Sequence, residues 1–359
     1  MLAPNVPLDA RQRSNQKHSL EIPLDTRGWR MRISIQIVIL ILTLAIGLQF
    51  YLYVQQAGGD GAITVHRPPG VEGFLPIGAL MGWKLFVTTG IWDPVHPAAM
   101  VIFGFAGLVC LFFRKAFCGW FCPVGTVSEW VWKLGRRMAG KNYRLPLWLD
   151  LPLLSLKYLL LGFFVWVIFT MSNREVLAFL DSAYYKVSDV KMMFFFTRMT
   201  LLTGIVLTFL SVASFFIRNF WCRYLCPYGA LMGILAWAGP TRICRSGDRC
   251  IGCGRCTKAC HFDLPVDRKK HIRSPECSGC MACTRVCPVD NTLLMKTSGF
   301  KKKAWTPISL GLTICILFAG LVYTARITGH WQTRVSEPEF RMLLKKIDSP
   351  LITHPGIRR

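Results

Sequence analysis

Eight cysteines between residues 250 and 287 form the pattern in this sequence that most clearly predicts chemistry. They stand in two runs, CIGCGRCTKAC and CSGCMACTRVC, and each run is spaced C-x2-C-x2-C-x3-C. This spacing is typical of two [4Fe–4S] clusters, because the fourth thiolate of each run reaches the cluster of the other run. We therefore assign one cluster to Cys250, Cys253, Cys256 and Cys287, and the other to Cys277, Cys280, Cys283 and Cys260.

Two other uses of eight cysteines agree less well with this spacing. A disulfide framework is typical of a small secreted domain, and structural zinc sites usually show C-x2-C pairs separated by a longer gap. Gly252, Gly254 and Gly279 suit the tight turns that bring backbone N–H groups close to a cluster. The one departure from the usual pattern is His261, which stands where proline often follows the fourth cysteine.

Four more cysteines stand in an internal repeat and form a second class of thiol site. The segments FCGWFCPVG and WCRYLCPYG are offset by 104 residues, and each follows an apolar run that ends in a basic residue. If the apolar helix continued through C-x3-C, the two sulfurs of a pair would lie on one helix face. The thiols could together hold one metal or cluster, bind copper, act as a dithiol relay, or simply pack in the interior: Cys118, Cys122, Cys222 and Cys226. Cys110, Cys244 and Cys315 have no such pattern and are predicted to be structural.

The composition indicates an integral membrane protein. The chain has 359 residues, 52% of them hydrophobic and 13% aromatic, and its formal net charge is +24. Such a composition favours several membrane spans around a small soluble module. Basic residues gather at the ends of apolar runs, as expected for topology signals and for anionic lipid headgroups, and no nucleic-acid-binding module is recognisable. We therefore predict a lipid bilayer and no nucleic acid as partner.

The predicted fold is a mainly α integral membrane protein of about five transmembrane helices, with an inserted ferredoxin-like α+β domain that carries two [4Fe–4S] clusters. The apolar runs 33–54, 98–113, 151–171, 200–217 and 305–324 are the predicted spans. Residues 74–89 are predicted to be interfacial or re-entrant, and Lys157 is expected to extend its ammonium to the interface. The predicted domains are an N-terminal tail (1–30), a four-helix membrane domain with both CxxxCP repeats (31–243), the ferredoxin domain (244–296), a fifth span (297–327) and a polar tail (328–359).

The distribution of Lys and Arg predicts the orientation in a bacterial cytoplasmic (inner) membrane. The N-terminal tail and the segments 114–150 and 218–303 are basic and should be cytoplasmic. The loops 55–96 and 172–198 are near neutral and should face the periplasm. Arg218 and Lys301–Lys303 place the ferredoxin domain in the cytoplasm, and five spans then put the C-terminus in the periplasm, although the tail is itself net basic.

With these motifs, the chain resembles the membrane polyferredoxin family. That family includes NapH-type subunits, CcoG-type proteins of oxidase maturation and the membrane part of NosR-type proteins. The stretches RPPGVEGFLPIGALMG, CRYLCPYGALMG and WLDLP are similar to its YccM-type members, and the resemblance covers the chain from about residue 30 onward. It implies electron transfer between the membrane quinone pool and a redox partner.

Other electron carriers are not predicted. None of the seven histidines lies in a predicted span and no C-x-x-C-H is present, so neither membrane haem nor c-type haem is expected. No GxGxxG or Walker motif predicts a nucleotide site. A quinol site needs proton acceptors at the interface, and the best candidates are His96, Asp93 and Glu72, with His66 and Lys84 nearby and a weaker set at Asp181, Tyr184 and Lys186. His96 and Asp93 could instead cap the second span.

The predicted function is electron transfer between quinol or quinone and a redox protein, such as a reductase, ferredoxin or flavodoxin, with a quinol dehydrogenase-type activity left open. A basic surface would attract an acidic partner: Arg249, Arg255, Lys258 and Arg268–Lys270. Two alternatives are a cluster-dependent copper reductase or assembly factor and a membrane redox-sensing regulator. The direction of electron flow cannot be read from the motif, because cluster potentials span about a volt.

Overall fold

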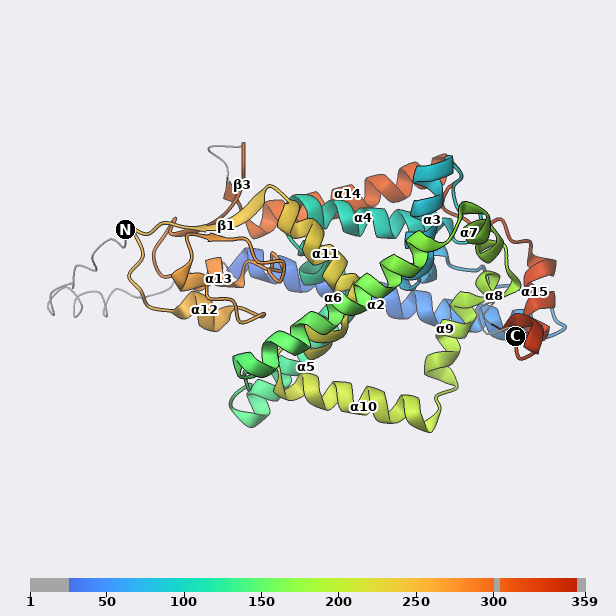
Figure 1. Ribbon diagram of the computed structural model, residues 1–359, viewed down its shortest axis with the longest axis horizontal. Helices are drawn as coiled ribbons and strands as arrows, with labels where there is room; N and C mark the ends of the chain where they lie inside the picture. Colours follow the sequence, from blue (N-terminus) through green and yellow to red (C-terminus); the bar gives the residue numbers. More distant parts are fainter. Residues whose placement is uncertain (1–25, 300–303, 354–359) are drawn as a thin grey trace, which may run out of the picture.

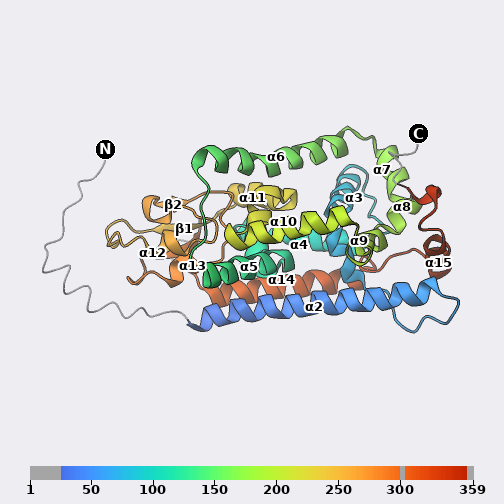
Figure 2. The same cartoon turned by 90° about the horizontal axis from the view of Figure 1, so that it is seen from below.

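The computed structural model describes residues 26–299 and 304–353 and shows a bundle of helices with a small sheet-bearing domain at one end (Figure 1). The predicted N-terminal tail up to residue 25 and the basic run Lys301–Lys303 lie outside the described residues. In Figure 2 the long helix α2 (Thr26–Gly58) runs beside α14 (Pro307–Ile327), with which it is in contact. These two helices form one side of the bundle.

Each predicted span corresponds to a helix, although not all are long enough to cross a membrane alone. Within the described ranges, α2, α6 (Leu147–Thr170) and α14 have the length and composition of spans. Helix α9 (Ser188–Thr197) and α10 (Leu201–Phe216) form a fourth only if the pair, bent by 77°, is counted as one. Helix α4 (Pro97–Phe113) has 17 residues and α11 (Pro227–Ala238) has 12. The structure therefore supports three or four spans, and the predicted figure of about five is not confirmed.

The span helices do not continue through the CxxxCP motifs, so the condition for placing both sulfurs of a pair on one helix face is not met. Helix α4 ends at Phe113, and Arg114 has a φ of 63°. The first motif then forms a π turn, η2 (Phe117–Phe121), and Cys122 is extended. The second repeat does the same, with η3 (Trp221–Leu225) following Asn219, whose φ is 52°. New helices, α5 (Pro123–Ala139) and α11, begin at the proline of each motif, because proline suits the first helical position.

The predicted α+β domain lies between α11 and α14. Its antiparallel sheet has the order β2-β1-β3-β4, and Ile243 pairs with Met295 in the register of the central strands. The elements are β1 (Thr241–Arg245), α12 (Arg255–Ala259), η4 (Val266–Arg268), β2 (His271–Ile272), α13 (Ala282–Arg285), β3 (Leu293–Thr297) and β4 (Ala304–Trp305). Sheet and membrane helices share one apolar core, in which Met295 lies with Trp120 and Leu310. The domain is therefore packed against the bundle.

Short elements form the end of the bundle opposite the sheet (Figure 1). They are η1 (Pro69–Phe74), α3 (Pro76–Thr89), α7 (Asn173–Leu180), α8 (Ala183–Lys186), α15 (Glu337–Lys345) and η5 (Pro350–Ile352). The segment predicted to be interfacial is thus mostly α3. Lys84 of α3 donates to the backbone carbonyls of Ile168, at 2.8 Å, and of Met171. A cation at the carboxyl end of α6 is stabilised by the helix dipole.

Candidate iron–sulfur and thiol sites

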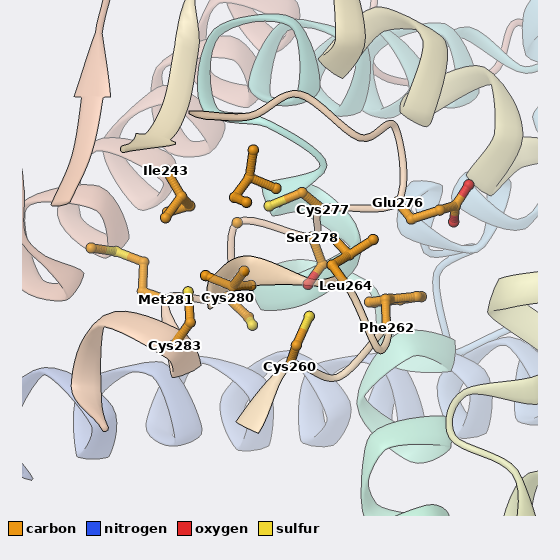
Figure 3. Close-up of a pocket in the computed structure, with 13 residues that line it drawn as sticks. Ile243, Cys260, Phe262, Leu264, Glu276, Cys277, Ser278, Cys280, Met281 and Cys283 are labelled. Atoms are coloured by element: carbon orange, nitrogen blue, oxygen red, sulfur yellow. The ribbon is translucent and has the colours of Figure 1, made fainter. Parts of the chain in front are cut away.

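The structure brings the four thiols of the second predicted cluster to one cavity. Figure 3 shows the sulfur atoms facing a common space, which is also lined by apolar residues such as Ile243 and Leu264: Cys260, Cys277, Cys280 and Cys283. Gly279 and Met281 have φ values of 59° and 57°, so the chain turns tightly between the ligands. The donor set suits a [4Fe–4S] cluster, which binds four thiolates.

The thiols of the first predicted cluster line a second cavity. It is formed by the loop before α12 and the residues after α13: Cys250, Cys253, Cys256 and Cys287. Gly252 and Gly254 have φ values of 69° and 68°, as expected for the tight turns predicted there. Cys253 is exposed, whereas the thiols of the other cavity are buried or partly buried. The first group therefore lies nearer the surface, and its donor set also suits a [4Fe–4S] cluster.

A buried ionic network connects α2 to the second thiol group. Arg32 is 1% exposed and forms two hydrogen bonds to the Glu129 carboxylate, at 3.0 and 2.5 Å. His261 lies 3.5 Å from the same carboxylate. Burial raises the pKa of the Cys280 thiol, but His261 and Arg32 outweigh this effect and lower it to about 6. His261, the departure from the usual pattern, thus lies with Arg32 beside a predicted ligand.

The four CxxxCP thiols line one large cavity of about 850 Å³. Its end near the sheet is formed by both π turns, so the two repeats contribute one pair each: Cys118 with Cys122, and Cys222 with Cys226. Burial and the neighbouring thiol of Cys226 raise the pKa of Cys118 to about 11, although the ammonium of Lys115 opposes this change. Burial and the adjacent thiols raise the pKa of Cys222 to about 12. The repeat therefore brings four thiols to one cavity.

This thiol site adjoins the second ferredoxin group directly. Phe262 and Ser278 line both cavities. The N–H of Lys115 donates to the Cys277 carbonyl at 3.3 Å, and Trp120 donates to the Gly279 carbonyl at 3.1 Å. Among the described residues, no group of three or more His, Cys, Asp or Glu side chains is placed to bind one metal ion.

The large cavity extends from the thiols toward the opposite end of the bundle. It is lined along α2 from Arg32 to Gln49 and ends near His66, Arg67 and Arg326. Because α2 rises 1.5 Å per residue, the seventeen steps from Arg32 to Gln49 cover about 25 Å, close to the hydrocarbon thickness of a bilayer. The middle is apolar, with Ile39, Ile46, Ile102, Phe105 and Phe318. The cavity is thus an elongated apolar space with polar groups at each end.

The predicted quinol residues Glu72, Asp93 and His96 lie together, but all are at most 1% exposed. His96 Nδ1 is 3.5 Å from Glu72, and Asp93 accepts from the Tyr185 hydroxyl at 2.6 Å. Glu72, rather than Asp93, accepts from the first turn of α4, through Ala98 N–H at 2.9 Å. These three residues join η1, α4 and α8 in a buried network and do not line the large cavity.

The other predicted proton acceptors lie at different places in the fold, and two of them, Lys186 and Asp181, form an ion pair. His66 lines the far end of the large cavity. Lys84 caps α6, as described above. Lys186 forms ion pairs with Asp181 at 2.8 Å and Glu339 at 2.9 Å, so it ties α8 to α15. Tyr184 lies below the ammonium of Lys191, 5.3 Å from its ring centre.

Several residues of these sites were not identified from the sequence. Lys157, expected to reach the interface, is instead 0% exposed and pairs with Glu276 at 2.6 Å. Lys115 marks the end of an apolar run, yet it is buried beside the thiols. The Arg32–Glu129 pair spans 97 residues and leaves no local signal. The sequence signal that could have pointed to these buried charges is a charged residue inside a predicted span, as at Lys157.

Comparison with known proteins finds one matching family profile and several relatives. A family profile described as a 4Fe–4S binding domain matches residues 95–142 and 199–244, the segments that contain the two CxxxCP motifs. YccM of Escherichia coli (strain K12), named as a candidate electron transport protein, is 41% identical over 295 residues, which cover 81% of this chain and 82% of YccM. The regulatory protein NosR of Pseudomonas aeruginosa is 27% identical over 185 residues, 51% of this chain and 24% of NosR. The methylamine utilization ferredoxin-type protein MauN of Methylobacillus flagellatus is 27% identical over 172 residues, 45% of this chain and 54% of MauN. No solved structure matches the chain.

Fold and comparisons together define an iron–sulfur protein of electron transport with the helices of a membrane protein. The chain belongs to the membrane polyferredoxin family, to which YccM also belongs and to which NosR and MauN are related. The resemblance inferred from the motifs is thus confirmed.

Proposed function

We propose that this protein transfers electrons between the membrane quinone pool and a cytoplasmic redox protein. In this proposal the eight ferredoxin cysteines hold two [4Fe–4S] clusters, and the four CxxxCP thiols together hold a third iron–sulfur centre. Such centres accept and donate single electrons. The observation that carries the proposal is the large apolar cavity, which has four thiols at one end and adjoins the second ferredoxin group there.

The shape and lining of the cavity suit a quinone. Its apolar middle and length of about 25 Å fit an isoprenoid chain lying along α2. The redox-active ring would lie at the thiol end, where Ser278 and Phe262 separate this cavity from the next thiol group. Glu72, Asp93 and His96, the residues first considered for quinol, would then stabilise the opposite end of the protein and would not contact the ring.

The surface near the exposed Cys253 suits an acidic protein partner. Exposed basic residues surround the first ferredoxin group: Arg249, Lys258, Arg268, Lys269 and Lys270. Complementary charge accelerates the encounter of two proteins, and salt screens it over about 8–10 Å. An acidic ferredoxin or flavodoxin would therefore exchange electrons faster at low ionic strength. The same basic residues favour a cytoplasmic position for this domain.

Filling the cavity tests the proposal. Ile46 lines it, whereas Leu44 on the same helix is 65% exposed and faces outward. In lipid vesicles, the Ile46→Trp variant should lower the rate of cluster reduction by a quinol analogue at least tenfold, while reduction by dithionite stays unchanged. The Leu44→Trp control should behave as the natural protein does. Equal quinol rates in both variants would contradict a quinone in this cavity.

The same preparation separates the two alternative functions. If no quinol analogue exchanges electrons with the protein, a redox-sensing regulator is favoured. If instead Cu²⁺ is reduced, and this activity disappears in the Cys122→Ser and Cys226→Ser variants with both ferredoxin clusters intact, a copper reductase is favoured.

A further inference from the structure

The buried charges beside the thiol site do not balance. Lys115 is 1% exposed and Lys157 is 0% exposed, and both approach the single carboxylate of Glu276. Lys157 donates to Glu276 at 2.6 Å, and Tyr158 donates to its second oxygen at 2.8 Å. Lys115 lies farther away, with its Nζ at 3.5 Å. One carboxylate therefore faces two ammonium groups, and one positive charge is left over.

The surplus charge is on Lys115, which lies near thiols of both CxxxCP repeats: Cys118, Cys222 and Cys226. Among the described residues its Nζ has no hydrogen-bond partner, and Lys115 lines the large cavity together with the thiols of both repeats. Burial alone would lower the pKa of Lys115, but Glu276 and the thiols of Cys118, Cys226 and Cys222 raise it. A buried cation that shares its carboxylate partner with a second ammonium group is unfavourable, so a further anion is expected beside Lys115.

The internal repeat shows that this cation is not required by the fold of the motif. The offset of 104 residues places Asn219 at the position equivalent to Lys115. Asn219 is also buried and lines the same cavity, and its amide donates to the His261 carbonyl at 3.1 Å. A neutral side chain thus serves the second π turn, whereas the first has a cation.

We propose that Lys115 is the counter-cation of an anionic redox centre held by Cys118, Cys122, Cys222 and Cys226, and that it raises the reduction potential of this centre. The inference rests on the third iron–sulfur centre of the proposed function. Reduction adds one electron, supplied by quinol or by the cytoplasmic partner, and makes the centre one charge more negative. Because the ammonium is already in place, the added charge is stabilised without uptake of a proton. Lys115 is therefore a positioning residue for charge and not a ligand.

The test is a redox titration of the third centre, in which electron paramagnetic resonance measures the fraction that is reduced at each potential. Lys115→Asn installs the residue of the other repeat and should lower the potential. We expect at least a tenfold shift of the oxidised-to-reduced ratio, equivalent to about 59 mV for one electron. Lys141→Asn, which removes an exposed cation, should leave the potential unchanged. Adding Asn219→Lys to Lys115→Asn should restore part of the shift.

A second variant keeps the test independent of whether Lys115→Asn assembles. Glu276→Gln removes the carboxylate that is paired with Lys115 and should shift the potential of the third centre upward. If the natural protein contains the third centre and neither variant moves its potential, the role of Lys115 is refuted. If the natural protein contains only the iron of two clusters, the third centre itself is refuted. The two failures are therefore distinguishable.

Discussion

Replacing Gly119 by alanine should disturb the contact between the thiol site and the second ferredoxin group. Gly119 lies between Cys118 and Cys122 in the first π turn and is buried. A Cβ at this position would stand 2.5 Å from the Ser278 carbonyl oxygen and 3.4 Å from its Cβ. Ser278 lies between two predicted ligands, Cys277 and Cys280. The clash therefore involves backbone on both sides and cannot be relieved by rotating a side chain.

The cost follows from the geometry. To reach the 3.4 Å at which ordinary contact begins, the two backbones must separate by about 0.9 Å. Overpacking of this kind costs about 1–3 kcal/mol. The Gly119 carbonyl also accepts from Arg32 at 3.0 and 2.7 Å and from Gln36 at 3.2 Å, and these bonds would be strained. We expect Gly119→Ala to lower the free energy of unfolding by about 2–3 kcal/mol.

Gly162→Ala is the matched control, because a Cβ there meets nothing within 4 Å and the residue lies within α6. Alanine should stabilise that helix by up to about 1 kcal/mol. Both variants would be measured by thermal unfolding in lipid nanodiscs, and the clusters by electron paramagnetic resonance. If Gly119→Ala is as stable as Gly162→Ala and its cluster spectra are unchanged, the predicted clash with the Ser278 backbone is refuted.

Three other predictions concern buried or partly buried charged groups of the helical bundle. Arg32→Met leaves the Glu129 carboxylate buried without its main partner, so it should lower the free energy of unfolding by about 3–5 kcal/mol, as measured by denaturation of the purified protein. Lys84→Met removes the cation that caps the carboxyl end of α6, and we expect a loss of about 1–2 kcal/mol and faster amide exchange in the last turn of this helix. Burial alone would lower the pKa of His96, but the carboxylate of Glu72 outweighs this effect and raises it. Burial also raises the pKa of Glu72. The folded pair therefore holds its proton more firmly than either side chain does in water. The stabilisation should therefore be complete below the ordinary imidazole pKa of 6.5 and be lost as the pH rises through the raised value. The melting temperature of the natural protein should be higher at pH 6 than at pH 8.5, and this difference should be smaller in His96→Gln. Equal differences in the two proteins would contradict the role of His96.

Local patterns could be predicted from the sequence, because their causes are local. The positive φ values at Gly252 and Gly254 follow from the spacing of the ligands, which requires tight turns. The five apolar runs each became a helix, since length and composition decide this. The end of α4 was also visible at Arg114, where the apolar run stops.

Features that depend on distant partners could not be predicted. Lys157 was expected to reach water, but its partner Glu276 is 119 residues away and makes burial favourable. The π turn at Cys118 depends on a reversal at Arg114, whose guanidinium donates to the Ala236 carbonyl at 2.7 Å, 122 residues away. The large cavity likewise arises from packing among α2, α4, α14 and both π turns.

In the proposed function, twelve cysteines of this chain hold three iron–sulfur centres. The decisive test is the number of iron atoms per chain after anaerobic purification, together with electron paramagnetic resonance of the reduced protein. We predict about twelve iron atoms per chain, falling to about eight when Cys122 and Cys226 are both replaced by serine. Protein without iron after such a purification would contradict the assignment of all three sites. A value near eight that the double substitution leaves unchanged would contradict the third centre.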